Sequence, residues 1–259
     1  MAIGDDVCVT VVGWLWVAAV AVVGVGAAAT VRAAVFHFGV PAGEPWRTRC
    51  PHCETTIVRP GWGIIGSSLR PNGRCPHCGR PIGPPVAVVE LLAAATLGVL
   101  AWCAGFQVAT IGLLWAALVA LALALVDIAV HRLPDRLIAA ALAGAALFFA
   151  AAAIATGDYR RLGIALACGL GCGLVYFVIV FLTPRGMGLG DAKLAVLVGM
   201  TSGWFGTPTA ILAIFVGILF AGLWAIGLLA TRRVTRRDRI AYGPFMLLGA
   251  LTAVILATI

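Results

Sequence analysis

The sequence predicts an all-α protein, a polytopic membrane helix bundle of about eight spans with a short sixth span and a small cysteine-containing loop domain. Hydrophobic residues make up 62% of the 259 residues and charged residues only 11%, and the mean hydropathy is +1.07. Apolar stretches of about 17–25 residues, long enough to cross a bilayer as helices, recur along nearly the whole chain. One polar insertion rich in Arg, Pro and Gly interrupts them. This composition excludes an ordinary soluble domain.

The candidate spans are the eight apolar segments, and they cover residues 7–35, 86–104, 108–126, 137–155, 162–182, 194–203, 209–230 and 240–258. The first is expected to be retained, because Asp5 and Asp6 precede it and no Lys or Arg supplies the basic start of a signal peptide. The sixth is too short to cross unaided. We therefore expect a first span in residues 1–36, a loop domain in 37–85 and a polytopic domain in 86–259.

The positions of the basic residues predict the orientation. Fifteen of the 18 Lys and Arg residues fall in loops that share one side of the membrane if the spans alternate. The positive-inside rule then makes that side cytoplasmic and puts the N-terminus outside. The net charge of +8 could suggest a nucleic acid partner, but the clustering of the basic residues in these loops argues against one. It indicates instead a multi-pass protein of a cytoplasmic membrane, with the lipid bilayer as its partner.

Two Cys-Pro-His-Cys motifs lie in the polar loop, Cys50 to Cys53 and Cys75 to Cys78, with 21 residues between them. Two C-x-x-C pairs at such spacing are typical of a tetrahedral zinc site, and a metal would replace the apolar core that this loop lacks. A thiol–disulfide exchanger is the alternative. It would need one such motif at a helix N-terminus in a βαβ context, so two copies in a loop favour zinc.

Two acidic residues stand where a membrane protein tolerates them least. Asp127 follows an apolar run, and Asp191 closes Gly188-Leu189-Gly190-Asp191 before another. A carboxylate in hydrocarbon costs roughly 2.5–3.5 kcal/mol on insertion scales and usually marks a functional site. Two neighbouring carboxylates can share a proton, one acting as base and the other as acid. Pro134 and Asp135, by contrast, predict a helix start, where an acid has a capping role.

With these features the chain resembles the type IV prepilin leader peptidase family, membrane aspartic proteases with two essential aspartates and a G-x-G-D motif. The resemblance rests on residues in the same order along nearly the whole chain: Asp127 at the end of a span, Leu133-Pro134-Asp135 after it, Gly188 to Asp191 followed by Lys193, a separation of 64 residues between the two acids, Val89-Glu90-Leu91-Leu92, and Ile240-Ala241-Tyr242-Gly243-Pro244-Phe245, which resembles the family's I-P-F-G-P-F stretch.

The resemblance implies cleavage of prepilins or pseudopilins at the cytoplasmic face of a bacterial inner membrane, after the glycine that ends a short basic leader. Asp127 and Asp191 would activate a water without a covalent intermediate. It also extends to methylation of the new N-terminus with S-adenosylmethionine. That match is weaker, because Gly26-Ala27-Ala28-Ala29-Thr30 stands where the family has G-S-F-L-N, and Glu90 is the remaining candidate.

Two other functions remain as alternatives to a membrane peptidase. A transporter or channel would carry polar residues along several spans, and the span interiors here are nearly free of charge. A zinc-organised membrane scaffold would need only the cysteine loop, and both aspartates would then be dispensable. We rank the peptidase first.

Overall fold

The computed structural model describes residues 3–41, 43–59, 73–85, 87–182, 188–232 and 241–258. All regular structure in these segments is helical, with two isolated β-bridges in the cysteine loop. The described helices are α1 (Ile3–Phe38), α2 (Val88–Ala104), α3 (Val108–Val130), α4 (Asp135–Thr156), α5 (Tyr159–Leu182), α6 (Leu189–Gly203), α7 (Thr207–Ala230) and α8 (Gly243–Thr258).

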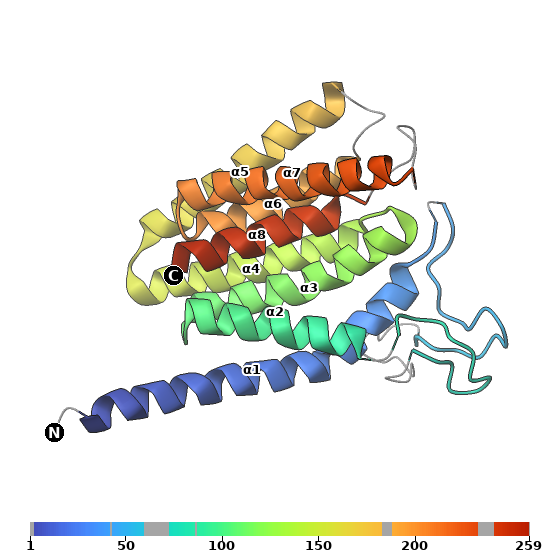
Figure 1. The fold of residues 1–259 in the computed structure, drawn as a ribbon, viewed down its shortest axis with the longest axis horizontal. Coiled ribbons are helices and arrows are strands. Elements are labelled where there is room, and N and C mark those ends of the chain that lie inside the picture. Colours follow the sequence, from blue (N-terminus) through green and yellow to red (C-terminus); the bar gives the residue numbers. More distant parts are fainter. Residues whose placement is uncertain are drawn as a thin grey trace.

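Successive helices run back and forth across the bundle (Figure 1). The end of α3 and the starts of α4, α6 and α8 consequently lie at the same end of the bundle as the cysteine loop, and the start of α1 and the end of α8 lie at the other end. This alternation brings segments that are far apart in the sequence to one face of the membrane. It is the first condition for the two acidic residues to meet.

Five of the described helices are long and apolar enough to cross a bilayer: residues Gly13–Phe38 of α1, and all of α3, α4, α5 and α7. α2 and α8 are apolar but shorter, with 17 and 16 residues. α6 has 15 residues and carries charge in its first two turns. The prediction of a polytopic helix bundle with a short sixth helix is confirmed.

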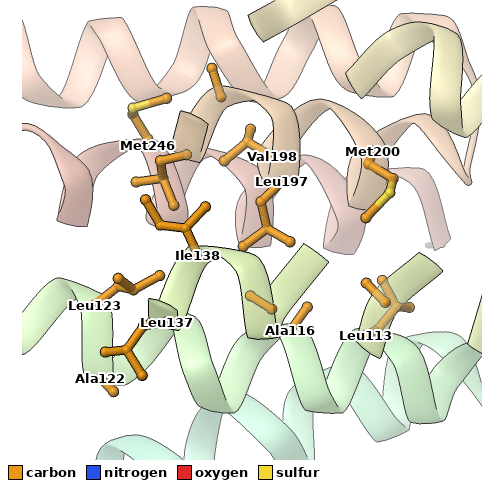
Figure 2. Packing of buried hydrophobic residues seen from close by; sticks show 14 of the residues in the cluster. Leu113, Ala116, Ala122, Leu123, Leu137, Ile138, Leu197, Val198, Met200 and Met246 are labelled. Atoms are coloured by element: carbon orange, nitrogen blue, oxygen red, sulfur yellow. The ribbon is translucent and has the colours of Figure 1, made fainter. Parts of the chain in front are cut away.

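The centre of the bundle is a tightly packed apolar core. Leu123 of α3, Ile138 of α4, Leu197 of α6 and Met246 of α8 are all buried there (Figure 2). Small residues let the backbones approach closely, as is usual where helices pack in lipid. A Cβ on Gly249 of α8, for example, would lie 2.6 Å from the backbone nitrogen of Gly217 of α7. The core thus fixes the relative positions of α3, α6 and α8, the helices that bear the site.

Among the helix boundaries that differ from the sequence-based expectation, two affect the acidic residues. α3 continues past residue 126 to Val130 and ends where His131 adopts a left-handed conformation at φ 51°. α6 begins at Leu189 rather than at residue 194. Each acid therefore lies within a helix instead of in the adjoining loop.

Candidate active site and metal centre

Asp127 lies in the last turn of α3 and is 5% exposed. Its Oδ2 accepts a hydrogen bond of 3.0 Å from the backbone N–H of Gly243, the first residue of α8. Glycine leaves room for this contact, because a Cβ there would lie 2.9 Å from the same carboxylate oxygen. The start of α8 therefore compensates in part for the burial of this acid and fixes its orientation.

Asp191 is the third residue of α6 and is half-buried. Its Oδ2 accepts a 3.0 Å hydrogen bond from the N–H of Gly188, the extended residue that caps the helix. This side-chain cap satisfies an amide that a helix start leaves unpaired, which explains why α6 begins earlier than the apolar pattern suggests. A Cβ on Gly190 would lie 3.0 Å from Leu133 Cβ, so glycine lets α6 approach the segment that follows α3.

The two acidic side chains come together at the end of the bundle that carries the cysteine loop. They are close enough for the charge of Asp127 to act on Asp191. A Cβ on Gly243 would also lie 3.5 Å from Leu194 of α6, so the start of α8 is packed against both α3 and α6. Each acid thus lies on a separate helix, is oriented by a backbone amide and is within electrostatic reach of the other acid. Two carboxylates that interact in this way titrate jointly, so one can act as a base while the other acts as an acid.

Three further residues of the predicted motifs lie at the starts of α4 and α6, at the same end of the bundle. Pro134 caps α4 in an extended conformation, and Asp135 is the first residue of that helix, as the sequence predicts. Lys193 Nζ donates a 2.6 Å hydrogen bond to Asp135 Oδ1, and both side chains are exposed. The lysine therefore links the starts of α6 and α4. The sequence analysis did not anticipate this partner.

A pair of tyrosines escaped the sequence analysis. The hydroxyls of Tyr176, in the C-terminal half of α5, and Tyr242, directly before Gly243, are 2.9 Å apart. Tyr176 is 1% exposed, so its hydroxyl needs a partner inside the protein. The charge of Asp191 acts on both phenols, which places them near the acidic pair. The sequence did contain one hint of this pair: Tyr242 occupies a position where the I-P-F-G-P-F stretch of the family has Phe.

A buried ion pair on the other side of the bundle was also missed. Arg32 of α1 is fully buried and donates to Glu90 Oε2 at 2.6 Å and to the carbonyl oxygens of Pro84 and Pro85 at 2.5 and 3.3 Å. Glu90, the candidate for methylation chemistry, is therefore the counter-ion of Arg32. This partner could have been suspected from the sequence, because Arg32 is the one charged residue in the expected first span, residues 7–35, and a charge there requires a partner.

The cysteine loop forms two copies of one turn. In the first copy, Cys50 N–H donates to Thr55 at 2.9 Å and the Cys50 carbonyl accepts from Glu54 at 3.0 Å. In the second, Cys75 N–H donates to the carbonyl of residue 80 at 2.9 Å, and its own carbonyl accepts from Gly79 at 3.1 Å. The fifth residue of each copy is left-handed, with φ 56° at Glu54 and 69° at Gly79. The same conformation therefore presents both cysteine pairs.

The four sulfurs fit a zinc ion. Those of Cys50, Cys53, Cys75 and Cys78 all lie within 4.8 Å of one another, and two pairs are separated by 3.8 and 3.6 Å. Tetrahedral zinc with bonds of about 2.3 Å sets its sulfurs about 3.8 Å apart.

The neighbouring thiols perturb one another's pKa values in opposite directions. Hydrogen bonds from the side chain and backbone of Thr55 lower the pKa of Cys53 to about 6. A backbone hydrogen bond from Arg80 does not offset desolvation and the neighbouring thiols, which raise the pKa of Cys78 to about 11. Four adjacent thiolates are stable together only around a cation.

Comparisons with known proteins give a consistent result. The model of the type IV leader peptidase family matches residues 113–226, which include both acidic residues. The prepilin leader peptidase/N-methyltransferase of Aeromonas hydrophila is 30% identical over 214 residues, 81% of this chain and 71% of that protein. The protein of the same name from Dickeya chrysanthemi is 29% identical over 234 residues, 85% and 80% of the two chains. One from Burkholderia pseudomallei is 30% identical over 225 residues, 82% and 68%. No solved structure matches the chain.

Proposed function

Because the chain belongs to the type IV leader peptidase family, we propose that it is a membrane-embedded aspartic endopeptidase that removes the short basic leader from prepilins or pseudopilins. One observation of the fold supports this most directly. Two acids, on helices α3 and α6, converge at one end of a membrane bundle, and a backbone N–H holds one oxygen of each. Neither a scaffold nor a thiol–disulfide exchanger requires this arrangement.

The proposed chemistry assigns the two carboxylates complementary roles. In the described part of the chain, protein hydrogen bonds reach Oδ2 of Asp127 and of Asp191, which leaves each Oδ1 for water and substrate. One carboxylate removes a proton from the water, whose oxygen attacks the scissile carbonyl carbon, while the other, protonated, donates to the carbonyl oxygen. Collapse of the tetrahedral species breaks the C–N bond, and the leaving amine takes a proton from the pair. The dyad titrates as a unit.

We propose zinc as the structural metal of Cys50, Cys53, Cys75 and Cys78. Thiolate ligands from both turns would close residues 37–85 into one small domain, and the metal would supply folding free energy that this segment lacks. Phe36, near the end of α1, belongs to the same buried cluster as Cys50 and Cys75. The loop domain is thereby attached to the first span, at the same end of the bundle as the acidic pair (Figure 1).

The proposed topology follows from the basic loops. The protein is a multi-pass membrane protein, and we assign it to the bacterial inner membrane with the cysteine loop and both acids on the cytoplasmic side. Residues 1–36 form the first span, 37–85 the loop domain and 86–259 the peptidase domain. A reporter fused after Ile259 is expected to be periplasmic, because eight crossings starting from outside return the chain to the outside.

The relatives' names include a second activity, N-methyl transfer. We assign only the peptidase activity to the residues described above, because the carboxylate of Glu90 is occupied by Arg32. Transfer of a labelled methyl group from S-adenosylmethionine to a cleaved substrate in reconstituted membranes tests the second activity separately.

Co-expression with candidate prepilins tests the peptidase assignment. Asp127→Asn and Asp191→Asn each remove a group needed for proton transfer, so the yield of mature-size product should fall roughly 10²–10⁴-fold. Asn can still accept the hydrogen bonds from Gly243 and Gly188, so both variants should insert and fold. Asp158→Asn is the matched control, because Asp158 is exposed at the start of α5, at the other end of the bundle. Normal processing by either active-site variant would favour the scaffold instead.

A further inference from the structure

An open apolar groove of about 310 Å³ runs between α2, α3, α6 and α8. No charged side chain lines it, and its two polar residues are Thr96 and Thr201. The Thr201 hydroxyl donates to the carbonyl of Leu197 at 2.8 Å, so it is satisfied within its own helix. The groove therefore suits an apolar occupant that brings no hydrogen-bonding groups of its own.

The groove leads to the acidic pair along three helices. On α3 its wall includes Ala120, Ala124 and Ile128, and Asp127 continues this i, i+3, i+4 stripe. On α6, Val198 and Thr201 stand seven and ten residues after Asp191, on the same helical face.

On α8, the third of these helices, the groove also leads to the acidic pair. The wall of the groove on α8 starts at Pro244, the residue after the glycine whose N–H holds Asp127. Both acids thus stand at one end of one groove.

We propose that this groove binds an apolar helix of the substrate, with the helix N-terminus at the acidic pair. The inference rests on the proposed function and adds to it the docking surface and the direction of the bound helix. The α3 wall extends from Leu113 to Ile128, which is about 22 Å at 1.5 Å per residue. A helix of about 15 residues has this length, and its start would place the preceding peptide bond beside the carboxylates.

The shape of the groove indicates how such a helix is held. A helix about 10 Å across and 22 Å long occupies roughly 1,700 Å³, so the groove admits the side chains of one face while the opposite face remains in lipid. The α3 wall contains Ala116, Ala117, Ala120 and Ala124. Small residues allow close approach of two backbones. In lipid no hydrophobic force drives helices together, so this close packing is what holds them.

A helix explains the alignment of the groove better than a lipid chain does. An acyl chain fills apolar surface wherever that surface occurs and gains nothing from ending at two carboxylates. A substrate helix gains from this placement, because docking along the groove delivers its N-terminal peptide bond to the reacting groups in a fixed orientation.

Site-specific photo-crosslinking tests the proposal. A benzophenone amino acid replaces Leu248, a groove residue on α8 that is 48% exposed, or Leu219, an α7 residue outside the groove that is 45% exposed. Both variants carry Asp191→Asn so that the prepilin stays intact. A prepilin adduct is expected from position 248 and not from position 219. Crosslinks from Ile128 should map nearer to the scissile bond than those from Leu251, which lies deeper on α8.

A blocked groove provides the second measurement. Ala124→Trp projects a large side chain into the groove, and the KM for full-length prepilin should rise at least tenfold. Ala151→Trp, at an exposed alanine of α4 outside the groove, should leave KM unchanged. Thermal melting of both variants checks folding. If Ala124→Trp does not fold, the crosslinks alone decide the outcome.

The possible results separate the two levels of inference. Processing by the wild type without adducts from position 248 would overturn the groove and leave the peptidase intact. Adducts from this position with lipid acyl chains only, while the prepilin is present and bound, would do the same. Absence of any processing by the wild type would reject the peptidase assignment, and the groove proposal with it.

Discussion

Gly243→Ala tests the role of Asp127 without changing any ionisable group. The added methyl would lie 2.9 Å from Asp127 Oδ2 and 3.5 Å from Cγ of the same side chain. Real Cβ atoms do not approach an oxygen so closely, so one of the two must move. Gly243 is buried at the start of α8, where the helix backbone has little freedom to move. The carboxylate, at the end of a side chain, is the part that yields.

The expected loss of activity follows from the displacement. A Cβ–oxygen contact of about 3.4 Å is ordinary, so the carboxylate oxygen moves by several tenths of an ångström and its hydrogen bond of 3.0 Å from the Gly243 N–H is distorted. A misplacement of about 1 Å at a reacting group can cost about 10²-fold in rate. We therefore expect kcat to fall about 10- to 100-fold. Overpacking should cost about 1–3 kcal/mol of stability, so most of the protein remains folded.

Prepilin cleavage in reconstituted membranes measures this effect, with kcat and KM determined separately. Gly222→Ala is the matched control, because a Cβ on Gly222 of α7 has no heavy atom within 4 Å. That variant should keep the wild-type kcat. If Gly243→Ala is folded and turns over prepilin at the wild-type rate, then the position of the Asp127 carboxylate does not limit the chemistry, and the roles assigned to the dyad are wrong.

Three further predictions concern contacts that lie outside the dyad. Arg32→Met leaves the carboxylate of Glu90 without its partner in a largely buried site and should lower stability, measured by thermal melting, by about 3–5 kcal/mol. The double variant Arg32→Met/Glu90→Met should recover much of this loss. Equal losses in the two variants would argue against the ion pair. Cys75→Ser removes one of four thiolates, so metal analysis should find close to one zinc per wild-type chain and almost none in the variant, whereas equal zinc contents would exclude the site. Tyr176→Phe leaves the hydroxyl of Tyr242 unsatisfied and should cost about 1 kcal/mol of stability; the double variant Tyr176→Phe/Tyr242→Phe should be closer to wild type, and a larger loss in the double variant would contradict this reasoning.

The sequence by itself determined the helical class of the protein and the identity of its unusual residues. Hydrocarbon leaves a backbone no hydrogen-bond partner outside its own segment, so long apolar runs must be helices whatever surrounds them. The two Cys-Pro-His-Cys pairs could also be recognised from the sequence, because zinc ligands of this kind lie close together in the chain. Asp127 and Asp191 stood out because a carboxylate is rare in an apolar segment. These are local signals, and each can be recognised within a short window.

Only the tertiary structure decided which residues those groups meet. The Gly243 N–H reaches Asp127 across 116 residues, Tyr242 reaches Tyr176 across 66, and Glu90 reaches Arg32 across 58. No propensity or spacing rule connects positions so far apart, because the packing of several helices sets these contacts. The groove has the same origin, since its walls come from α2, α3, α6 and α8. A single sequence lists the groups that can react, and the folded bundle determines where a substrate can reach them.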